Sequence, residues 1–240
     1  MVGRERGEFI ARARGFGVDV AEAVVERLEL YWERLTAAAA VLDLVGPAKL
    51  GGNFAEEMLD ALAPLGVAEL AGGGRVLDVG SGGGLPGVPV AICRPDLSVT
   101  LLDANRRKAA FLSDVVWALE LDDCRVVSER AEVWGHMPGE RGSYDLVLAR
   151  GVAALPVLLE LTLPFVRVGG LAVLHKGPGL EEERAEAGKA VALLGGSWRG
   201  SWWYEPGRGV RRALFVVRKV AATPAAYPRR SGIPARRPLV

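Results

Sequence analysis

The 240-residue sequence predicts an α/β fold: a mostly parallel, seven-stranded sheet with an antiparallel terminal hairpin, preceded by an N-terminal helical extension. Three observations support this prediction. After residue 74, short β-branched or Leu-rich runs alternate with longer helical stretches, which is typical of a parallel sheet with crossover helices. The last two apolar runs are separated only by a short Glu-Pro-Gly-Arg-Gly turn, so they are expected to pair antiparallel. The first third has apolar residues at helical spacing among charged ones.

The N-terminal extension is expected to be helical throughout. Apolar positions within residues 8–42 predict amphipathic helices, and another helix is expected over residues 54–65. Gly72, Gly73 and Gly74 then break the chain. We therefore expect residues 1–72 to form an extension distinct from the sheet-forming part of the chain.

The main domain is expected to cover residues 73–220 and to end in the hairpin. Its parallel strands are predicted near residues 75–79, 98–103, 124–128, 144–149 and 170–175, with helices between them, and the hairpin strands near residues 197–204 and 211–217. The remaining tail, residues 221–240, is rich in Pro and Arg. Its prolines argue against a regular helix or a central strand there.

Bulk properties limit the possible functions. The net charge of +1 argues against indiscriminate coating of nucleic acid. No apolar run approaches the roughly 20 residues that span a bilayer, and the N-terminus lacks an apolar signal segment, so we expect a cytoplasmic protein with no membrane partner. Cys93 and Cys124 have no neighbouring Cys or His at metal-ligand spacing, so we expect two reduced core thiols and no metal. The oligomeric state is open, with a monomer favoured.

The segment from Arg75 to Gly87, RVLDVGSGGGLPG, predicts a strand followed by a loop that holds a nucleotide-like cofactor. Small residues such as Gly80 and Gly82 let the backbone turn sharply and let a ligand approach closely. The spacing of the loop glycines also satisfies the G-x-G-x-x-G pattern of nicotinamide and flavin proteins, which is the main alternative. Asp78 within the strand favours a positively charged cofactor over a pyrophosphate, and thus S-adenosyl-L-methionine.

The next two strands contribute further candidates for cofactor binding. Asp103 ends the second predicted strand 23 residues after Gly80, where a carboxylate can accept both ribose hydroxyls of an adenosine. An alternative role for Asp103 is the N-cap of the following helix. Ala131 and Glu132 follow the third strand, where a loop can reach the adenine edge, although Glu132 could instead be a solvated loop charge.

Two basic residues follow the fourth and fifth strands. Arg150 and Lys176 are expected at the carboxyl edge of the sheet, where open α/β folds bind ligands, and each could instead be an exposed terminal charge. His136 and His175 show no spacing typical of a metal site or a catalytic triad, so they receive no role.

Six segments that run in order from about Arg75 to Leu239 resemble the RsmG (GidB) family: LDVGSGGGLPGVPVAI, VTLLDANRRKAAFL, RAE, YDLVLAR, GGLAVLHKG and TPAAYPRRSGIP. The resemblance implies a Rossmann-like class I methyltransferase fold. It also implies S-adenosyl-L-methionine as cofactor and methylation of N7 of a specific guanine in small-subunit (16S) ribosomal RNA. Together with the loop analysis, it places the cofactor at Asp78, Gly80, Gly82, Leu85, Asp103, Ala104, Asn105, Ala131, Glu132 and Arg150.

The N-terminal third departs from the family pattern. Family members often have an Asn-Leu-Thr stretch and a His-x-x-Asp-Ser-Leu motif, whereas the comparable segments here are Asp43–Gly46 (DLVG) and Glu57–Leu62 (EMLDAL). Of the second motif, Asp60 and the apolar positions remain. Gly151 also replaces the alanine that usually follows the arginine. These departures concern the substrate side more than the cofactor.

The implied reaction needs no general base, since N7 of neutral guanine carries a free lone pair, and we therefore assign no catalytic residue. A cation beside N7 would oppose the charge that develops on the purine, so Arg150 is expected to hold a carboxylate, a phosphate or O6. Phosphate contacts are expected from Arg106, Arg107, Lys108, Lys176, Arg229 and Arg230. For the first three, the alternative is a solvated basic helix face.

Three other functions remain open at this point. In a methyltransferase that acts on a small molecule or a protein, the basic tail would have no role in substrate binding. A nicotinamide oxidoreductase would bind NAD(H) instead of S-adenosyl-L-methionine. A cofactor-binding RNA module would bind both ligands without turnover. The expected partner is 16S ribosomal RNA, as naked RNA or within the small ribosomal subunit.

Overall fold

The computed structural model describes residues 3–39, 53–68, 70, 72–207 and 209–239. Its centre is a seven-stranded sheet in the order β3-β2-β1-β4-β5-β7-β6. The strands are β1 (Arg75–Val79), β2 (Ser98–Leu102), β3 (Cys124–Val127), β4 (Tyr144–Arg150), β5 (Val166–Lys176), β6 (Gly196–Gly207) and β7 (Val210–Lys219). The first five pair in parallel, and β7 pairs antiparallel with both β5 and β6. The predicted sheet and its terminal hairpin are confirmed.

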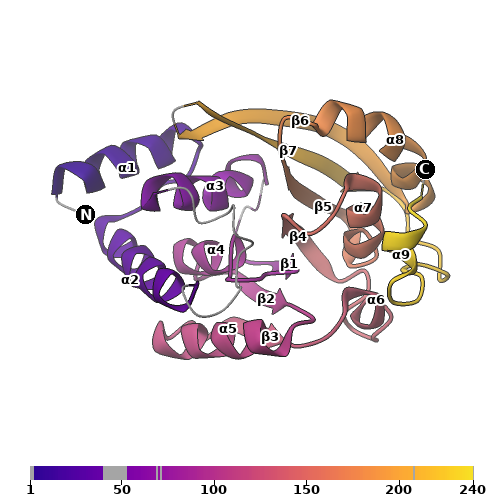
Figure 1. Ribbon diagram of the computed structural model, residues 1–240, viewed down its shortest axis with the longest axis horizontal. Helices are drawn as coiled ribbons and strands as arrows, with labels where there is room; N and C mark the ends of the chain where they lie inside the picture. Colours follow the sequence, from indigo (N-terminus) through magenta and orange to yellow (C-terminus); the bar gives the residue numbers. More distant parts are fainter. Residues whose placement is uncertain (1–2, 40–52, 69, 71, 208, 240) are drawn as a thin grey trace.

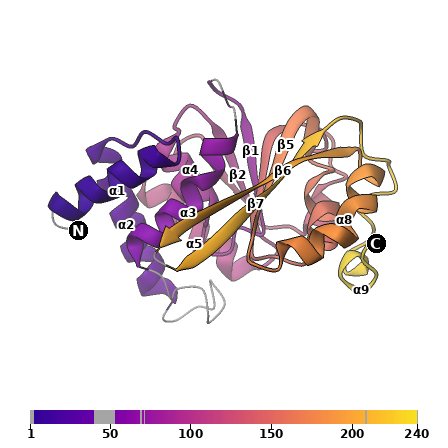
Figure 2. The same ribbon diagram turned by 90° about the horizontal axis from the view of Figure 1, so that it is seen from above.

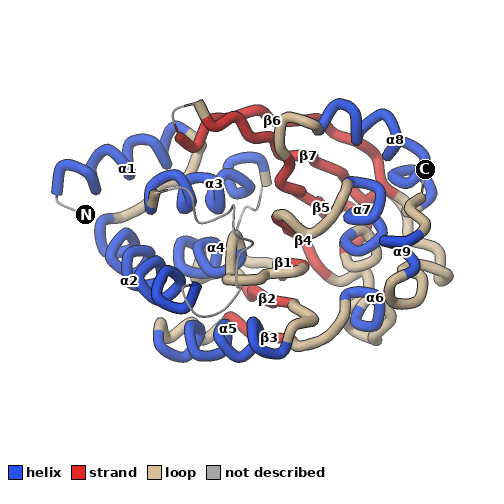
Figure 3. The backbone as a smooth tube through the Cα atoms, viewed as in Figure 1, coloured by secondary structure: helices blue, strands red, loops and turns tan. Residues whose placement is uncertain are grey.

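Helices cover both faces of the sheet, as the crossover pattern predicts (Figures 1 and 3). They are α1 (Gly3–Gly15), α2 (Glu22–Ala39), α3 (Phe54–Val67), α4 (Gly87–Cys93), α5 (Arg106–Ala118), α6 (Ala131–Trp134), α7 (Leu155–Thr162), α8 (Leu180–Leu193) and α9 (Ile233–Arg236). Figure 2 shows α1 to α5 on one side of the sheet and α8 and α9 on the other. Because both faces are covered, β1 and β4 are buried along most of their length.

The N-terminal helices share a hydrophobic core with one face of the sheet. Phe9 of α1, Leu28 of α2 and Met58 of α3 belong to the same buried cluster as Val76 and Leu146. The opposite face forms a second cluster with α7 and α8. The extension predicted for residues 1–72 thus packs directly on the sheet, and α3 reaches β6. The segment Asp43–Gly46, where the sequence departs from the family pattern, lies outside the described residues.

Two elements differ from the sequence prediction. β5 begins at Val166 rather than at residue 170, because its first residues pair with Tyr144 before a shift in register at Leu146. The tail was expected to contain no regular helix, and this is wrong for one turn: α9 spans Ile233–Arg236. Pro234 is tolerated there because it occupies the first turn, where the N–H that proline lacks has no intrahelical partner.

Candidate functional site

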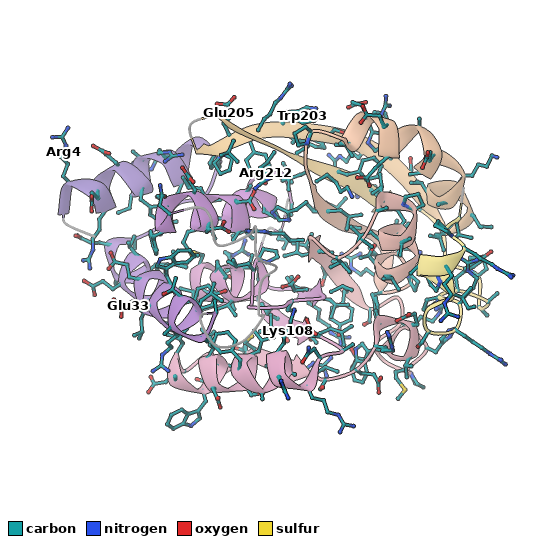
Figure 4. The ribbon with its side chains drawn as sticks, viewed as in Figure 1. Arg4, Glu33, Lys108, Trp203, Glu205 and Arg212 are labelled. Carbon is teal, nitrogen blue, oxygen red and sulfur yellow. The ribbon has the colours of Figure 1, made fainter. Side chains whose placement is uncertain are left out.

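A cavity of about 580 Å³ lies at the carboxyl ends of β1, β2 and β4, and we call it the glycine-loop cavity. It is lined by the loops that follow these strands and by the tail, including the predicted residues Gly80, Gly82, Leu85, Asp103, Ala104, Lys108, Ala131, Glu132 and Arg150. Lys108, at the start of α5, points toward this edge of the sheet (Figure 4). Asp78 and Asn105 do not line the cavity. The sequence therefore located the cavity well, although it missed Val152 and the tail residues Gly232 and Ala235.

The glycine loop has no room for a Cβ at Gly80 and at Gly87, among other positions. Gly80 has a φ of 71°, and a Cβ there would lie 2.7 Å from a methyl group of Val152. Gly87 begins α4 directly against the sheet, and a Cβ would lie 2.3 Å from Leu101 and 2.8 Å from Asp78. Both glycines therefore keep the loop close to its neighbours, and Gly80 leaves its backbone open to the cavity.

Asp78 is completely buried beneath the loop, and its role is to hold the loop rather than to face the cavity. Its Oδ2 accepts a hydrogen bond from the backbone N–H of Gly87 at 3.0 Å, and its Oδ1 has no partner within the described residues. Burial raises the pKa of Asp78 to about 7. The expectation that this carboxylate meets the cofactor directly therefore has no support from its position.

Asp103 ties the glycine loop to the start of α5. One carboxylate oxygen accepts from the N–H of Gly82 and the other from the N–H of Asn105, each at 2.8 Å. Asn105 is the N-cap of α5, where its side chain accepts from the N–H groups of Arg107 and Lys108 at 2.9 and 3.4 Å. Asp103 is thus not the helix cap, and the second lone pair of each oxygen remains available at the cavity wall.

Glu132 connects the glycine-loop cavity to the tail. Its Oε1 accepts a hydrogen bond from the N–H of Gly232 at 2.9 Å, so it is not a free solvated charge. Ala131 begins α6 at the same wall and is buried. The tail therefore covers one side of the glycine-loop cavity, which lies at the ends of the strands.

Arg150 stands at the boundary between this cavity and a second one. Its Nη2 donates a hydrogen bond to Oε2 of Glu57, and its Nη1 lies 2.8 Å from Oδ2 of Asp60. Burial opposes the charge on the guanidinium, but the carboxylates of Asp60 and Glu57 outweigh it and raise the pKa of Arg150. Arg150 therefore holds two carboxylates of the chain itself, and both of them come from the α3 segment that departs from the family motif.

The second cavity, of about 470 Å³, lies between α3 and the ends of β4, β5 and β7, and we call it the α3 cavity. It is lined by Glu56, Glu57, Asp60, Arg150, Gly151, Ala153, His175, Lys176, Gly177, Glu183, Pro206, Val210 and Arg212. Figure 4 places Arg212 and Trp203 on opposite sides of the hairpin, with Arg212 on the side of the α3 cavity. Sequence reasoning assigned only Arg150 and Lys176 from this group.

The six predicted phosphate contacts fall into different environments. Arg106, Arg107 and Arg230 are exposed. Lys176 is instead paired with Glu183 at 2.5 Å and donates to the backbone oxygen of Ala153 at 3.2 Å. Arg229 is paired with the fully buried carboxylate of Glu160 at 2.5 Å.

No group of three or more metal-type ligands occurs among the described residues, and no described helix is long and apolar enough to cross a membrane. Cys93 and Cys124 are free thiols, and burial raises the pKa of each to about 12. Burial also lowers the pKa of His175, so its ring is neutral at pH 7.

A family model described as rRNA small subunit methyltransferase G (GidB) matches residues 24–198 of the chain. The chain belongs to this family. A relative named ribosomal RNA small subunit methyltransferase G, from Pelotomaculum thermopropionicum, is 38% identical and aligns over 95% of both proteins. Another of the same name, from Moorella thermoacetica, is 36% identical over 98% of this chain and 99% of its own length. The GidB resemblance seen in the sequence is thereby confirmed over almost the whole chain.

Solved structures agree on the fold of this GidB family member. The YcgJ protein from Bacillus subtilis has a TM-score of 0.52 at 14% identity and covers 68% of this chain and 99% of its own. A transferase structure from Pyrococcus horikoshii has a TM-score of 0.53 at 16% identity and covers 72% of this chain and 66% of its own. The fold is the Rossmann-like class I methyltransferase fold, as expected.

Proposed function

We propose that this protein transfers the methyl group of S-adenosyl-L-methionine to N7 of a guanine in 16S ribosomal RNA. The observation that carries the proposal is the glycine-loop cavity, in a chain of the GidB family, with Asp103 on one wall and Arg150 at the opposite end. The relatives' shared name, ribosomal RNA small subunit methyltransferase G, supports the choice of substrate. It also makes the cytoplasm, where ribosomal RNA is found in bacteria, the expected location.

The residues of the cavity suit this cofactor. The carboxylate of Asp103 has lone pairs left for two ribose hydroxyls, and the open backbone at Gly80 and Gly82 admits the amino acid part. Leu85 and Ala131 offer apolar contact, and we propose that Ala131 and Glu132 reach the adenine edge. When bound, the cofactor supplies an electrophilic methyl group on a sulfonium.

The proposed reaction requires the protein to position the base rather than to transfer a proton. Methylation of N7 would use the free lone pair of that nitrogen to form the C–N bond at the expense of the C–S bond of the bound cofactor, and the purine would carry the positive charge. No proton has to leave before attack, so the proposed reaction needs no general base. The cavity walls must hold N7 at roughly 3 to 3.5 Å from the methyl carbon and exclude water.

RNA has to be held at the same edge of the sheet. We propose that Arg106, Arg107 and Arg230, which are exposed, contact phosphates, with Lys108 at the rim of the glycine-loop cavity. Lys176 and Arg229 would have to leave a carboxylate partner to do so. The first group is therefore the better candidate for the RNA surface.

Methyl transfer to defined RNA substrates tests the proposal. Small subunits and naked 16S RNA from a strain that lacks this gene should accept labelled methyl from the purified protein, and the label should map to N7 of one guanine. Comparing the two substrates also shows whether the assembled particle is required. Transfer to no guanine of 16S RNA, or saturable NAD(H) binding without S-adenosyl-L-methionine binding, would overturn the proposal.

A further inference from the structure

We propose that the α3 cavity binds the target guanine and that Glu57 recognises it through the N1–H and the 2-amino group. This inference rests on the proposed function, because it names the site that binds the guanine to which the methyl group is transferred. It also gives a role to the position where the sequence has glutamate in place of the histidine of the family motif.

The α3 cavity lies where an acceptor has to enter. Arg150, Gly151 and Ala153 line both this cavity and the glycine-loop cavity, so the two meet at the end of β4. Its volume of about 470 Å³ falls within the range of ordinary small-molecule sites. Enzymes that modify a base take it out of the stack into such a pocket and read its Watson–Crick edge there.

The charge of the α3 cavity suits a base rather than a phosphate. Four carboxylates line it, from Glu56, Glu57, Asp60 and Glu183, against three cations, from Arg150, Lys176 and Arg212. The ring of His175 in the same wall is neutral. The cavity as a whole therefore carries a net charge of about −1 and would repel an anion, whereas it favours a ring that becomes positive.

Glu57 is the carboxylate best placed to read a base. Its Oε2 accepts from Arg150, while its Oε1 accepts no hydrogen bond from any residue that the structure describes and is not fully enclosed. Guanine offers two adjacent donors, N1–H and the 2-amino group, which match the two oxygens of one carboxylate. Adenine offers an acceptor at N1, so the same carboxylate would reject it.

Asp60 acts through its neighbours as a positioning residue. The hydroxyl of Tyr204 on β6 donates to Oδ1 of Asp60 at 2.7 Å, and Oδ2 faces Nη1 of Arg150. Nε2 of His175 also lies 2.8 Å from the backbone oxygen of Asp60. These contacts from three strands fix α3 against the ends of β4, β5 and β6, and thereby fix Glu57.

The same arrangement offsets the repulsion between the positive charge of Arg150 and the positive charge that develops on the base. A lone guanidinium would oppose the positive charge that the purine gains, but Arg150 is paired with both Glu57 and Asp60. The three side chains together carry one negative charge. Among the described residues, Nη1 of Arg150 is buried and has only its ion-pair contact with Asp60.

The test compares guanosine with inosine at the methylated position, because inosine lacks only the 2-amino group. Small subunits are reconstituted with each nucleotide, and kcat/KM is measured for the unmodified protein, Glu57→Gln and the control Asp114→Asn. We expect the unmodified protein to lose about 10- to 100-fold on inosine. Glu57→Gln should lose a similar factor on guanosine and show little further loss on inosine, because the glutamine amide cannot accept both donors.

Asp114→Asn removes the same charge from an exposed position on α5, outside the α3 cavity, and its discrimination against inosine should match that of the unmodified protein. Binding of S-adenosyl-L-methionine by calorimetry should be equal in all three proteins, which shows that Glu57→Gln has folded. Full discrimination by Glu57→Gln, or none by the unmodified protein, overturns this inference while the proposed function stands. Absence of methylation on guanosine by the unmodified protein overturns the proposed function itself.

Discussion

The carboxylate of Asp103 accepts a hydrogen bond from the backbone N–H of Gly82 at 2.8 Å. The bond joins the end of β2 to the loop that follows β1, so one side chain both shapes the glycine loop and forms the wall of the cavity beside it. Its other oxygen is bonded to the N–H of Asn105 at 2.8 Å, which orients the carboxylate toward the cavity before any ligand binds. Asp103 is therefore held in one orientation, as the proposed contact with a ribose requires.

Replacing Asp103 should weaken the binding of S-adenosyl-L-methionine more than any other single change in the glycine-loop cavity. Asp103→Ala removes two hydrogen bonds to a charged acceptor, each worth about 1.5 to 3 kcal/mol, so the Kd should rise about 100-fold or more. Titration calorimetry measures it. Asp114→Asn, an exposed carboxylate on α5, is the control and should leave the Kd unchanged. A Kd for Asp103→Ala within a few-fold of the unmodified protein's would show that Asp103 does not hold the ribose.

Gly80→Ala should have two effects: the new Cβ should distort the glycine-loop cavity, and the positive φ should strain the backbone. The new Cβ would meet Val152, which lines the same cavity, so we expect at least about tenfold weaker cofactor binding in addition to a loss of stability of about 1 to 2 kcal/mol. Gly142→Ala separates the two effects, because Gly142 also has a positive φ, 62°, but no atom within 4 Å of its Cβ position. It should lose stability and keep its affinity. Equal losses of affinity in both variants would contradict this account.

Asp78 should make the stability of the protein depend on pH. Burial raises its pKa from 3.8 to about 7, so between these values the folded protein binds a proton that the unfolded chain has released. This contribution to stability is complete below pH 4 and is lost as the pH rises to about 7. Since one pKa unit corresponds to about 1.4 kcal/mol, the loss amounts to at most about 4 kcal/mol.

Asp78→Asn should remove that dependence. The amide oxygen can still accept from Gly87 and carries no charge, so the variant should be more stable than the unmodified protein at pH 8, by up to a few kcal/mol, and similar to it at pH 4. Urea unfolding at the two pH values measures the difference, with Asp114→Asn again as the control. An equal effect of Asp78→Asn at both pH values would show that Asp78 does not titrate in this range.

The sequence predicted those parts of the site that are local in the chain. Gly80, Gly82 and Asp103 could be placed because a glycine loop after a buried strand, and a carboxylate at the end of the next strand, occupy fixed positions in a parallel sheet. The strand positions themselves followed from apolar runs and turn residues. The early start of β5 at Val166 could not be predicted, because it depends on a shift in register against Tyr144 rather than on its own residues.

The contacts that the sequence missed join residues far apart in the chain. Glu57 is 93 residues from Arg150, and no pattern in the sequence relates them. The role expected for Asp78 has no support from the structure for a related reason: the direction of its side chain depends on the packing of α4. Likewise, nothing in the run of arginines at the tail distinguishes Arg229 from Arg230, although only Arg229 meets Glu160.

Arg229 and Arg230 are adjacent in the chain, but their substitution by alanine should have different effects. Arg229 donates from both its backbone and its side chain to Glu160, whose carboxylate is completely buried, whereas Arg230 is exposed. Arg229→Ala would keep the backbone hydrogen bond but remove the guanidinium that balances the charge of this carboxylate, so we expect a loss of about 3 kcal/mol in the free energy of unfolding. Arg230→Ala should keep its stability, bind 16S RNA less tightly and show a weaker dependence of binding on salt. Urea unfolding and RNA binding at several salt concentrations give the two readouts for each variant. If Arg229→Ala kept its stability and lost only RNA affinity, Arg229 would be an RNA contact rather than an anchor of the tail.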